Sequence, residues 1–127
     1  MRGEQLLSRP RKLRKVCSLP ESNKFGPLNS FQKQKRLVTM TIDEYETIRL
    51  IDLEGLTQEE CAGQMNIART TVQRIYTGAR KKIADSLTNS KVLKIEGGDY
   101  RLCDGFSESC NQGFCRRHRR RRKNGSR

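Results

Sequence analysis

The stretch MNIARTTVQRI, residues 65–75, decides which fold this chain is expected to adopt. Its apolar residues begin a series at spacings of three, four, four and four positions. The series consists of Val72, Ile75, Ala79, Ile83 and Leu87. Because such spacing places apolar side chains on one face of a helix, we predict a helix from near Ala68 to about Leu87.

The residues before this helix predict a short helix and a tight turn. Thr57 is a candidate N-cap, and Glu60, three residues later, completes a capping box. Asn66 tolerates the left-handed backbone conformation that ends a helix abruptly. Ala62 is small enough for two helices to cross closely beside it. A short helix, a tight turn and a longer helix form a helix-turn-helix unit.

Another helix is predicted before this unit. Thr41 is again a candidate N-cap, with Glu44 three residues later. The apolar residues that follow lie within one stripe of a helix, and Gly55 is a natural stop. The sequence therefore predicts three helices.

A short β-hairpin is predicted after the long helix. Residues 92–95 and 100–102 have strand-like composition, and Gly97-Gly98 between them is a two-residue turn signal. We expect these two strands to pair with each other.

The chain then divides into three parts. Residues 1–36 are interpreted as a basic, largely irregular N-terminal arm, because prolines and polar residues dominate there. Residues 37–102 form the expected helix-turn-helix domain with its C-terminal hairpin. Residues 103–127 are interpreted as a Cys- and Arg-rich flexible tail. The expected fold class is mainly α, with flexible basic arms.

The net charge of +13 is placed unevenly along the chain. Residues 1–16 carry six basic and one acidic side chain, and residues 116–127 carry eight basic and no acidic ones. Residues 17–115 are balanced, with 13 of each sign. Polyanions such as nucleic acids are the expected partners of such arms, since each neutralised phosphate releases counterions. The alternative is that basic tails only keep the protein soluble.

The long helix carries the residues expected to contact DNA. These are Arg69, Thr70, Thr71, Gln73, Arg74, Thr77, Arg80 and Lys81. Arg69 and Arg74 suit guanine, Gln73 suits adenine, and Thr70 suits a thymine methyl group or a phosphate. Thr71, near the helix start, suits a phosphate. The last two residues lie further along and suit backbone phosphates. The alternative is an ordinary helical hairpin whose charged face is simply solvated.

Four segments carry a resemblance to a known family: RPRKLRKVCSLPE, TIDEYETIRLIDLEGLTQEECAGQM, ARTTVQRI and KVLKIEGGDYRL. They resemble the prokaryotic uncharacterised protein family 0251, whose members are described as DNA-binding proteins, over about residues 9–102. The resemblance implies a helix-turn-helix similar to region 4 of sigma-70-type factors. By position, Arg69, Thr70, Gln73 and Arg74 occupy the base-reading positions of that motif. Ala68 stands where the family usually has a Ser N-cap.

The chain has five cysteines and one histidine. An odd number of cysteines argues against a disulfide framework, and Cys61 is expected to be a small core residue. Cys103, Cys110, Cys115 and His118 lie close together in sequence, and three thiols with an imidazole can bind zinc. Their spacing matches no common zinc finger. The tail is therefore interpreted either as a zinc or redox site or, more simply, as reduced thiols without a site.

The sequence favours a non-enzymatic, sequence-specific DNA-binding protein that regulates transcription. We find no phosphate-binding glycine loop, paired catalytic carboxylates or nucleophile–His constellation. One alternative is non-specific nucleic-acid binding by the arms, as in nucleoid or RNA-binding proteins. Another is a regulator that responds to metal or redox state through the tail cysteines. The expected location is cytoplasmic and nucleoid-associated, without membrane contact, and a homodimer is compatible with paired half-sites.

Overall fold

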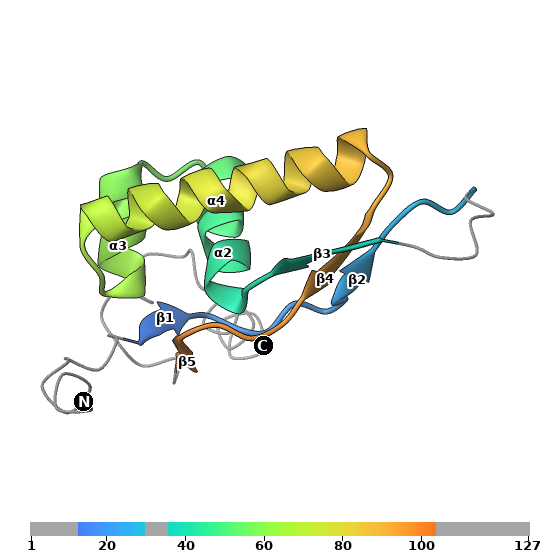
Figure 1. Ribbon diagram of the computed structural model, residues 1–127. Helices are drawn as coiled ribbons and strands as arrows, with labels where there is room; N and C mark the ends of the chain where they lie inside the picture. The colour runs from blue at the N-terminus through green and yellow to red at the C-terminus, as the bar shows by residue number, and fades with distance from the viewer. Residues whose placement is uncertain (1–12, 30–35, 104–127) are drawn as a thin grey trace, which may run out of the picture.

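The computed structural model describes residues 13–29 and 36–103 of the chain. In this part, the long helix α4 (Arg69–Thr88) lies across two shorter helices, α2 (Ile42–Thr47) and α3 (Gln58–Met65) (Figure 1). Helix α2 continues without interruption into a π-helical segment, η1 (Ile48–Leu53). The three predicted helices are thus confirmed, with a π-helical end that the sequence pattern did not indicate.

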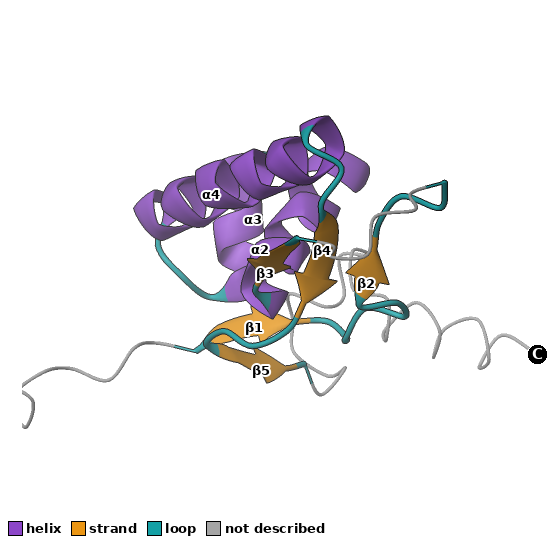
Figure 2. Ribbon diagram, turned by 45° about the vertical axis from the view of Figure 1, so that its right-hand side comes forward, coloured by secondary structure: helices purple, strands orange, loops and turns teal. Residues whose placement is uncertain are grey.

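Five short strands in the described residues form two small sheets. Strand β1 (Arg14–Val16) pairs in parallel with β5 (Tyr100–Leu102). Strand β4 (Val92–Ile95) is the centre of a three-stranded sheet, where it runs antiparallel to β2 (Lys24–Phe25) and parallel to β3 (Leu37–Met40). Figure 2 shows the β1–β5 pair below the helices and the three-stranded sheet beside α4.

Local sequence signals set the helix ends as predicted. Both capping boxes are present, with Thr41 accepting from the Glu44 amide at the start of α2 and Thr57 accepting from the Glu60 amide at the start of α3. Asn66 caps the end of α3 with a left-handed φ of 58°. These interactions involve residues three or four positions apart, which explains why the sequence predicts them well.

The predicted hairpin is wrong. Strands β4 and β5 pair with different partners, so the chain does not turn back on itself between them. Instead, Gly97 and Gly98 carry the chain past the start of α2, where the Gly97 carbonyl accepts from the Ile42 amide at 2.9 Å. Gly98 has a φ of +103°, and a Cβ there would lie 2.5 Å from an Asp43 carboxylate oxygen. Gly98 therefore permits a close approach to α2, and the two glycines do not form a hairpin turn.

The N-terminal part is less irregular than the predicted arm of residues 1–36. Arg14, Lys15, Val16 and Cys17 are buried, and β1 lies against α2 and α3. A three-residue strand with two charged side chains carries no clear sequence pattern, so the sequence does not indicate it. Residues 1–12 lie outside the described part of the chain.

Two apolar clusters hold the helices and strands together. One joins η1, α3 and α4 through Leu50, Met65 and Val72. The other joins the strands to α2 and α4, and its buried members are Val16, Met40, Ile42, Ala79 and Ile95. Cys61 is fully buried in the first cluster, as predicted. None of the described helices is long and apolar enough to cross a membrane.

Candidate nucleic-acid interface

Helices α3 and α4 are joined by the three residues 66–68. The Ile67 amide donates to the Ala62 carbonyl at 3.1 Å, and the Asn66 amide donates to the Gly63 carbonyl at 3.4 Å. Ala62 packs in the same apolar cluster as Val72 of α4. The backbone of the turn and the packing of the two helices thus hold the start of α4 in a defined position.

Helix α4 presents most of the predicted contact residues on its outer face. Val72, Ile75 and Ala79 point into the core and are buried. All of the predicted contact residues except Thr71 are exposed, and Thr71 is half-buried. The exposed set is Arg69, Thr70, Gln73, Arg74, Thr77, Arg80 and Lys81. The structure brings these side chains together on one helix, while their contacts with DNA stay a prediction.

The second half of α4 is different, because two of its three cations, Arg80 and Lys82, face carboxylates. Arg80 lies 3.9 Å from Asp52 and over the ring of Tyr76, 5.4 Å from its centroid. Lys82 contacts Glu44 at 2.7 Å. The Tyr76 hydroxyl donates to Asp52 at 2.7 Å, and this hydrogen bond raises the pKa of Tyr76. Acidic residues of α2 and η1 therefore offset part of the positive charge here.

The first turn of α4 lacks a side-chain cap, and backbone amides at such a helix start can bind phosphate. Ala68 is the N-cap residue, and its methyl group provides no side-chain hydrogen bond. No acidic residue lies in the first turn, in contrast to α2 and α3. The positive end of the helix dipole and the Arg69 guanidinium thus lie close together, an arrangement that favours an anion.

Sequence reasoning missed one further cation near the turn. Strand β5 brings Arg101 beside Asn66. The Asn66 side-chain amide is oriented so that its nitrogen donates to the Gly63 carbonyl at 3.3 Å. Its oxygen then accepts from the Arg101 guanidinium at 3.0 Å. Arg101 is exposed and lies at the α3–α4 turn only because β5 pairs with β1. No local signal in the sequence indicates this contact.

The predicted metal site is only partly within the described residues. Cys103 is buried against Cys17, while Cys110, Cys115 and His118 lie outside the described part of the chain. Among the residues that the structure does describe, no three His, Cys, Asp or Glu side chains are grouped so that they could hold a metal ion. The zinc interpretation of the tail stays a prediction.

Cys17 and Cys61 lie in different environments. An Arg49 guanidinium nitrogen donates to the Cys17 sulfur at 3.1 Å. Burial and, to a smaller extent, the negative charge of Glu46 raise the pKa of the Cys61 thiol to about 12. Cys61 is therefore an unreactive core residue, whereas Cys17 lies beside a cation.

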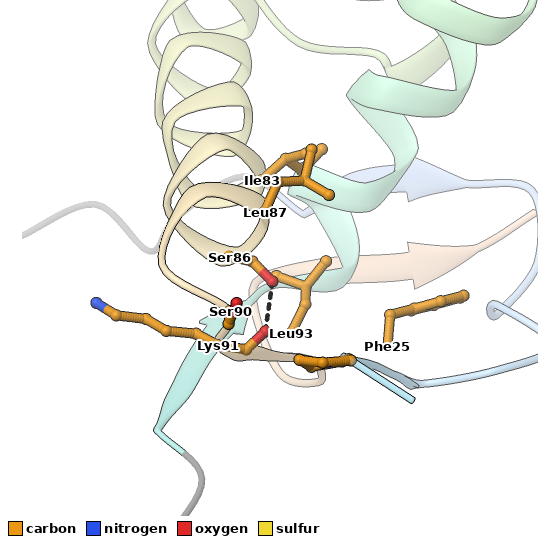
Figure 3. A pocket seen from close by; sticks show the side chains of 9 residues that line it. Phe25, Ile83, Ser86, Leu87, Ser90, Lys91 and Leu93 are labelled. Carbon is orange, nitrogen blue, oxygen red and sulfur yellow. Dashed lines mark hydrogen bonds between the residues drawn. The ribbon is translucent and has the colours of Figure 1, made fainter. Parts of the chain in front are cut away.

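An apolar groove at the other end of α4 was not predicted (Figure 3). It encloses about 320 Å³ between α4, β4 and the segment around Phe25. Its wall includes Ile83, Leu87 and Leu93. The Ser86 hydroxyl donates to the Lys91 carbonyl at 2.7 Å, so its hydrogen is directed at the backbone and not into the groove. Since binding pockets usually hold polar groups aimed at a ligand, the outer face of α4 is the stronger candidate site.

The described chain is thus a small, mainly helical domain with an exposed, basic helix face. It belongs to a family described as "Protein of unknown function DUF134", whose model matches residues 4–103.

Relatives in this family carry the name UPF0251, which agrees with the resemblance found in the sequence. A UPF0251 protein of Desulfitobacterium hafniense is 66% identical over 114 residues, which cover 90% of this chain and 91% of the relative. One from Halothermothrix orenii is 44% identical and covers 89% and 88% of the two chains. One from Thermoanaerobacter pseudethanolicus is 43% identical and covers 88% and 94%. No solved structure matches this chain.

Proposed function

We propose that this protein is a non-enzymatic transcriptional regulator that binds double-stranded DNA in a sequence-specific manner. Helices α3 and α4 would act as a helix-turn-helix similar to that of sigma-70 region 4. In this arrangement, the start of α4 enters the major groove, which is wide enough for one helix.

One observation carries the proposal: Arg69 and Arg74 in the first half of α4 differ in their surroundings from Arg80 and Lys82 in its second half. Arg80 and Lys82 face carboxylates of Asp52 and Glu44. Arg69 and Arg74 are exposed at the other end, where no ion pair with another described residue is found. If the charged face of α4 only kept the protein soluble, these two pairs of cations would not need to differ in their surroundings. The exposed arginines lie at the end of the helix that reaches base edges in helix-turn-helix proteins.

The other residues on this face support the same arrangement. Gln73 is exposed beside Arg74, so an adenine-reading and a guanine-reading side chain lie together. Thr70, Thr71 and the first-turn amides suit a phosphate at the groove edge. Arg101 adds a cation next to the turn. The basic arms at both ends of the chain would supply further phosphate contacts without reading sequence.

The test is selection from a random duplex DNA pool at about 150 mM salt, where non-specific phosphate binding is weakened. Wild type is run beside Arg74→Ala and beside Arg36→Ala, a matched loss of one exposed arginine before β3. We expect an enriched motif with wild type and Arg36→Ala. Arg74→Ala should lose discrimination at one or two positions, by about 1–3 kcal/mol per base pair.

Binding without any enriched motif would contradict sequence-specific recognition and favour the arms as the binding element. Equal loss of the motif in both arginine variants would contradict a special role for α4. A motif with two halves about 10 base pairs apart would indicate that a homodimer binds.

A further inference from the structure

The two sulfurs that the fold brings together are Cys17 and Cys103. They follow directly after the paired strands β1 and β5, in which Val16 is opposite Leu102. The Cys103 amide donates to the Val16 carbonyl at 2.7 Å, so the parallel pairing extends to the two cysteines. Neither is in a disulfide. They pack against each other, and their exposed fractions are 2% and 1%.

This register suits a disulfide. Neighbouring strands lie about 4.8 Å apart, and residues opposite each other point to the same side of a parallel pair. A disulfide needs Cα atoms about 4.4–6.8 Å apart. The two strands would therefore accept the bond without a change in their pairing.

The surroundings of Cys17 favour a reactive thiol. A guanidinium nitrogen of Arg49 donates to its sulfur at 3.1 Å, and such a hydrogen bond stabilises a thiolate. Glu46 faces the same cysteine and accepts from its amide at 3.1 Å, while it also holds Arg49 through two hydrogen bonds. The Glu46 carboxylate thus fixes the position of the guanidinium beside the sulfur.

We propose that Cys17 and Cys103 form a reversible redox site that hydrogen peroxide converts from two thiols to one disulfide. The Cys17 thiolate attacks a peroxide oxygen, which gives a sulfenic acid and releases hydroxide. The Cys103 thiol then attacks that sulfur, the disulfide forms and water leaves. Peroxide is reduced and the two cysteines are oxidised by two electrons. A thiol reductant reverses the reaction by exchange.

Local opening of β5 gives peroxide access to the buried pair. This strand has three residues and pairs with β1, and Arg101 and Leu102 are exposed. Short strands with few hydrogen bonds open more easily than the core. Once formed, the disulfide joins the first and last described strands and closes a long loop.

The experiment uses the full chain with Cys110→Ser and Cys115→Ser, so that tail thiols cannot compete. After hydrogen peroxide treatment, remaining thiols are alkylated and the protein is digested with trypsin. We expect a linked pair of peptides, residues 16–24 and residues 102–116, which dithiothreitol separates. The intact mass should fall by about 2 Da through loss of two hydrogens. The Tm should rise by on the order of 10 °C, because the crosslink restricts the unfolded chain.

Cys61 is the internal control and should be recovered as an unlinked thiol. Adding Cys17→Ala to this background should abolish the linked peptide and leave Cys103 free. Recovery of Cys17 and Cys103 as alkylated thiols or as separate sulfinic acids would overturn the proposal. Because the peptide map does not require the Cys17→Ala variant to fold, it decides the question alone.

Discussion

Arg49 and Glu46 are both charged and both almost completely buried, with exposed fractions of 4% and 1%. Arg49 contacts Glu46 at 2.9 Å and Glu54 at 3.1 Å. Burial by itself would lower the pKa of Arg49, but the hydrogen bond and negative charge of Glu46 raise it above its ordinary value. The guanidinium therefore stays charged inside the protein, where its partners offset the cost of desolvation.

Replacing Glu46 by Gln should destabilise the domain strongly. The substitution keeps the side-chain size and removes the charge that compensates buried Arg49. We expect the free energy of unfolding to fall by about 3 kcal/mol, since a buried ion that loses its partner is costly. Urea denaturation monitored by circular dichroism measures this change.

Glu59→Gln is the matched control, because Glu59 is exposed in the first turn of α3. This substitution should lower the free energy of unfolding by less than about 1 kcal/mol, the usual size of a helix-dipole effect. Similar losses for Glu46→Gln and Glu59→Gln would show that the buried ion pair contributes little to stability.

At the scale of elements, α4 is held along its length by different contacts. Its buried face packs on α3 near Val72 and on β3 and β4 further along. At Gly78 it crosses α2 closely, and a Cβ there would lie 3.3 Å from a Glu44 carboxylate oxygen. This contact gives a structural reason for a glycine inside an otherwise regular helix. The start of α4, in contrast, lacks a side-chain cap.

Replacing Ala68 by Ser should stabilise the start of α4. Ala68 already has the extended conformation of an N-cap residue, with φ of −72° and ψ of 150°. A Ser hydroxyl there can accept from the Thr71 amide, and we expect a gain of about 1 kcal/mol in the free energy of unfolding. Chemical denaturation and amide hydrogen exchange in the first turn of α4 measure the effect.

Ala84→Ser provides the comparison inside the same helix. Ala84 is exposed in the middle of α4, where Ser lowers helix propensity by about 0.5 kcal/mol. An unchanged or lower stability for Ala68→Ser would mean that the hydroxyl does not cap the helix.

For the whole molecule, the main property is the separation of charge. The net charge of +13 comes from the two ends of the sequence, while the central residues are balanced. Within the described part, acids of α2 and η1 contact Arg80 and Lys82 in the second half of α4, whereas Arg69 and Arg74 are exposed in its first half. Under the proposed function, α4 contacts the bases and the basic arms contact the phosphates.

Deleting residues 116–127, which carry eight basic side chains, should weaken binding to all duplexes alike. The slope of log K against log salt concentration should become less negative. The change is up to about 7 if all eight deleted basic side chains contact B-DNA phosphates. The selected motif should stay the same. Fluorescence anisotropy over a range of salt concentrations measures both quantities.

Replacing the arginines at positions 119–122 by lysine retains the tail charge and should preserve the salt dependence. If the deletion abolishes binding to the preferred duplex at every salt concentration, the arms alone carry the affinity. That result would favour non-specific nucleic-acid binding over the proposed reading by α4.

The sequence by itself determined the helices, their caps and the exposed face of α4. The capping boxes at Thr41 and Thr57, the left-handed Asn66 and the inward position of Val72 depend on neighbours within a few residues. Such short-range interactions are visible in a sequence pattern.

Only the tertiary structure decided which distant segments meet. It showed that β4 and β5 pair with different strands, that Arg14–Val16 forms β1, and that Arg49 is buried with its carboxylate partners. It also placed Cys17 beside Cys103 and Arg101 beside Asn66. These contacts join residues far apart in the chain, and their stability comes from packing and charge neutralisation in the folded state, which local propensity does not encode.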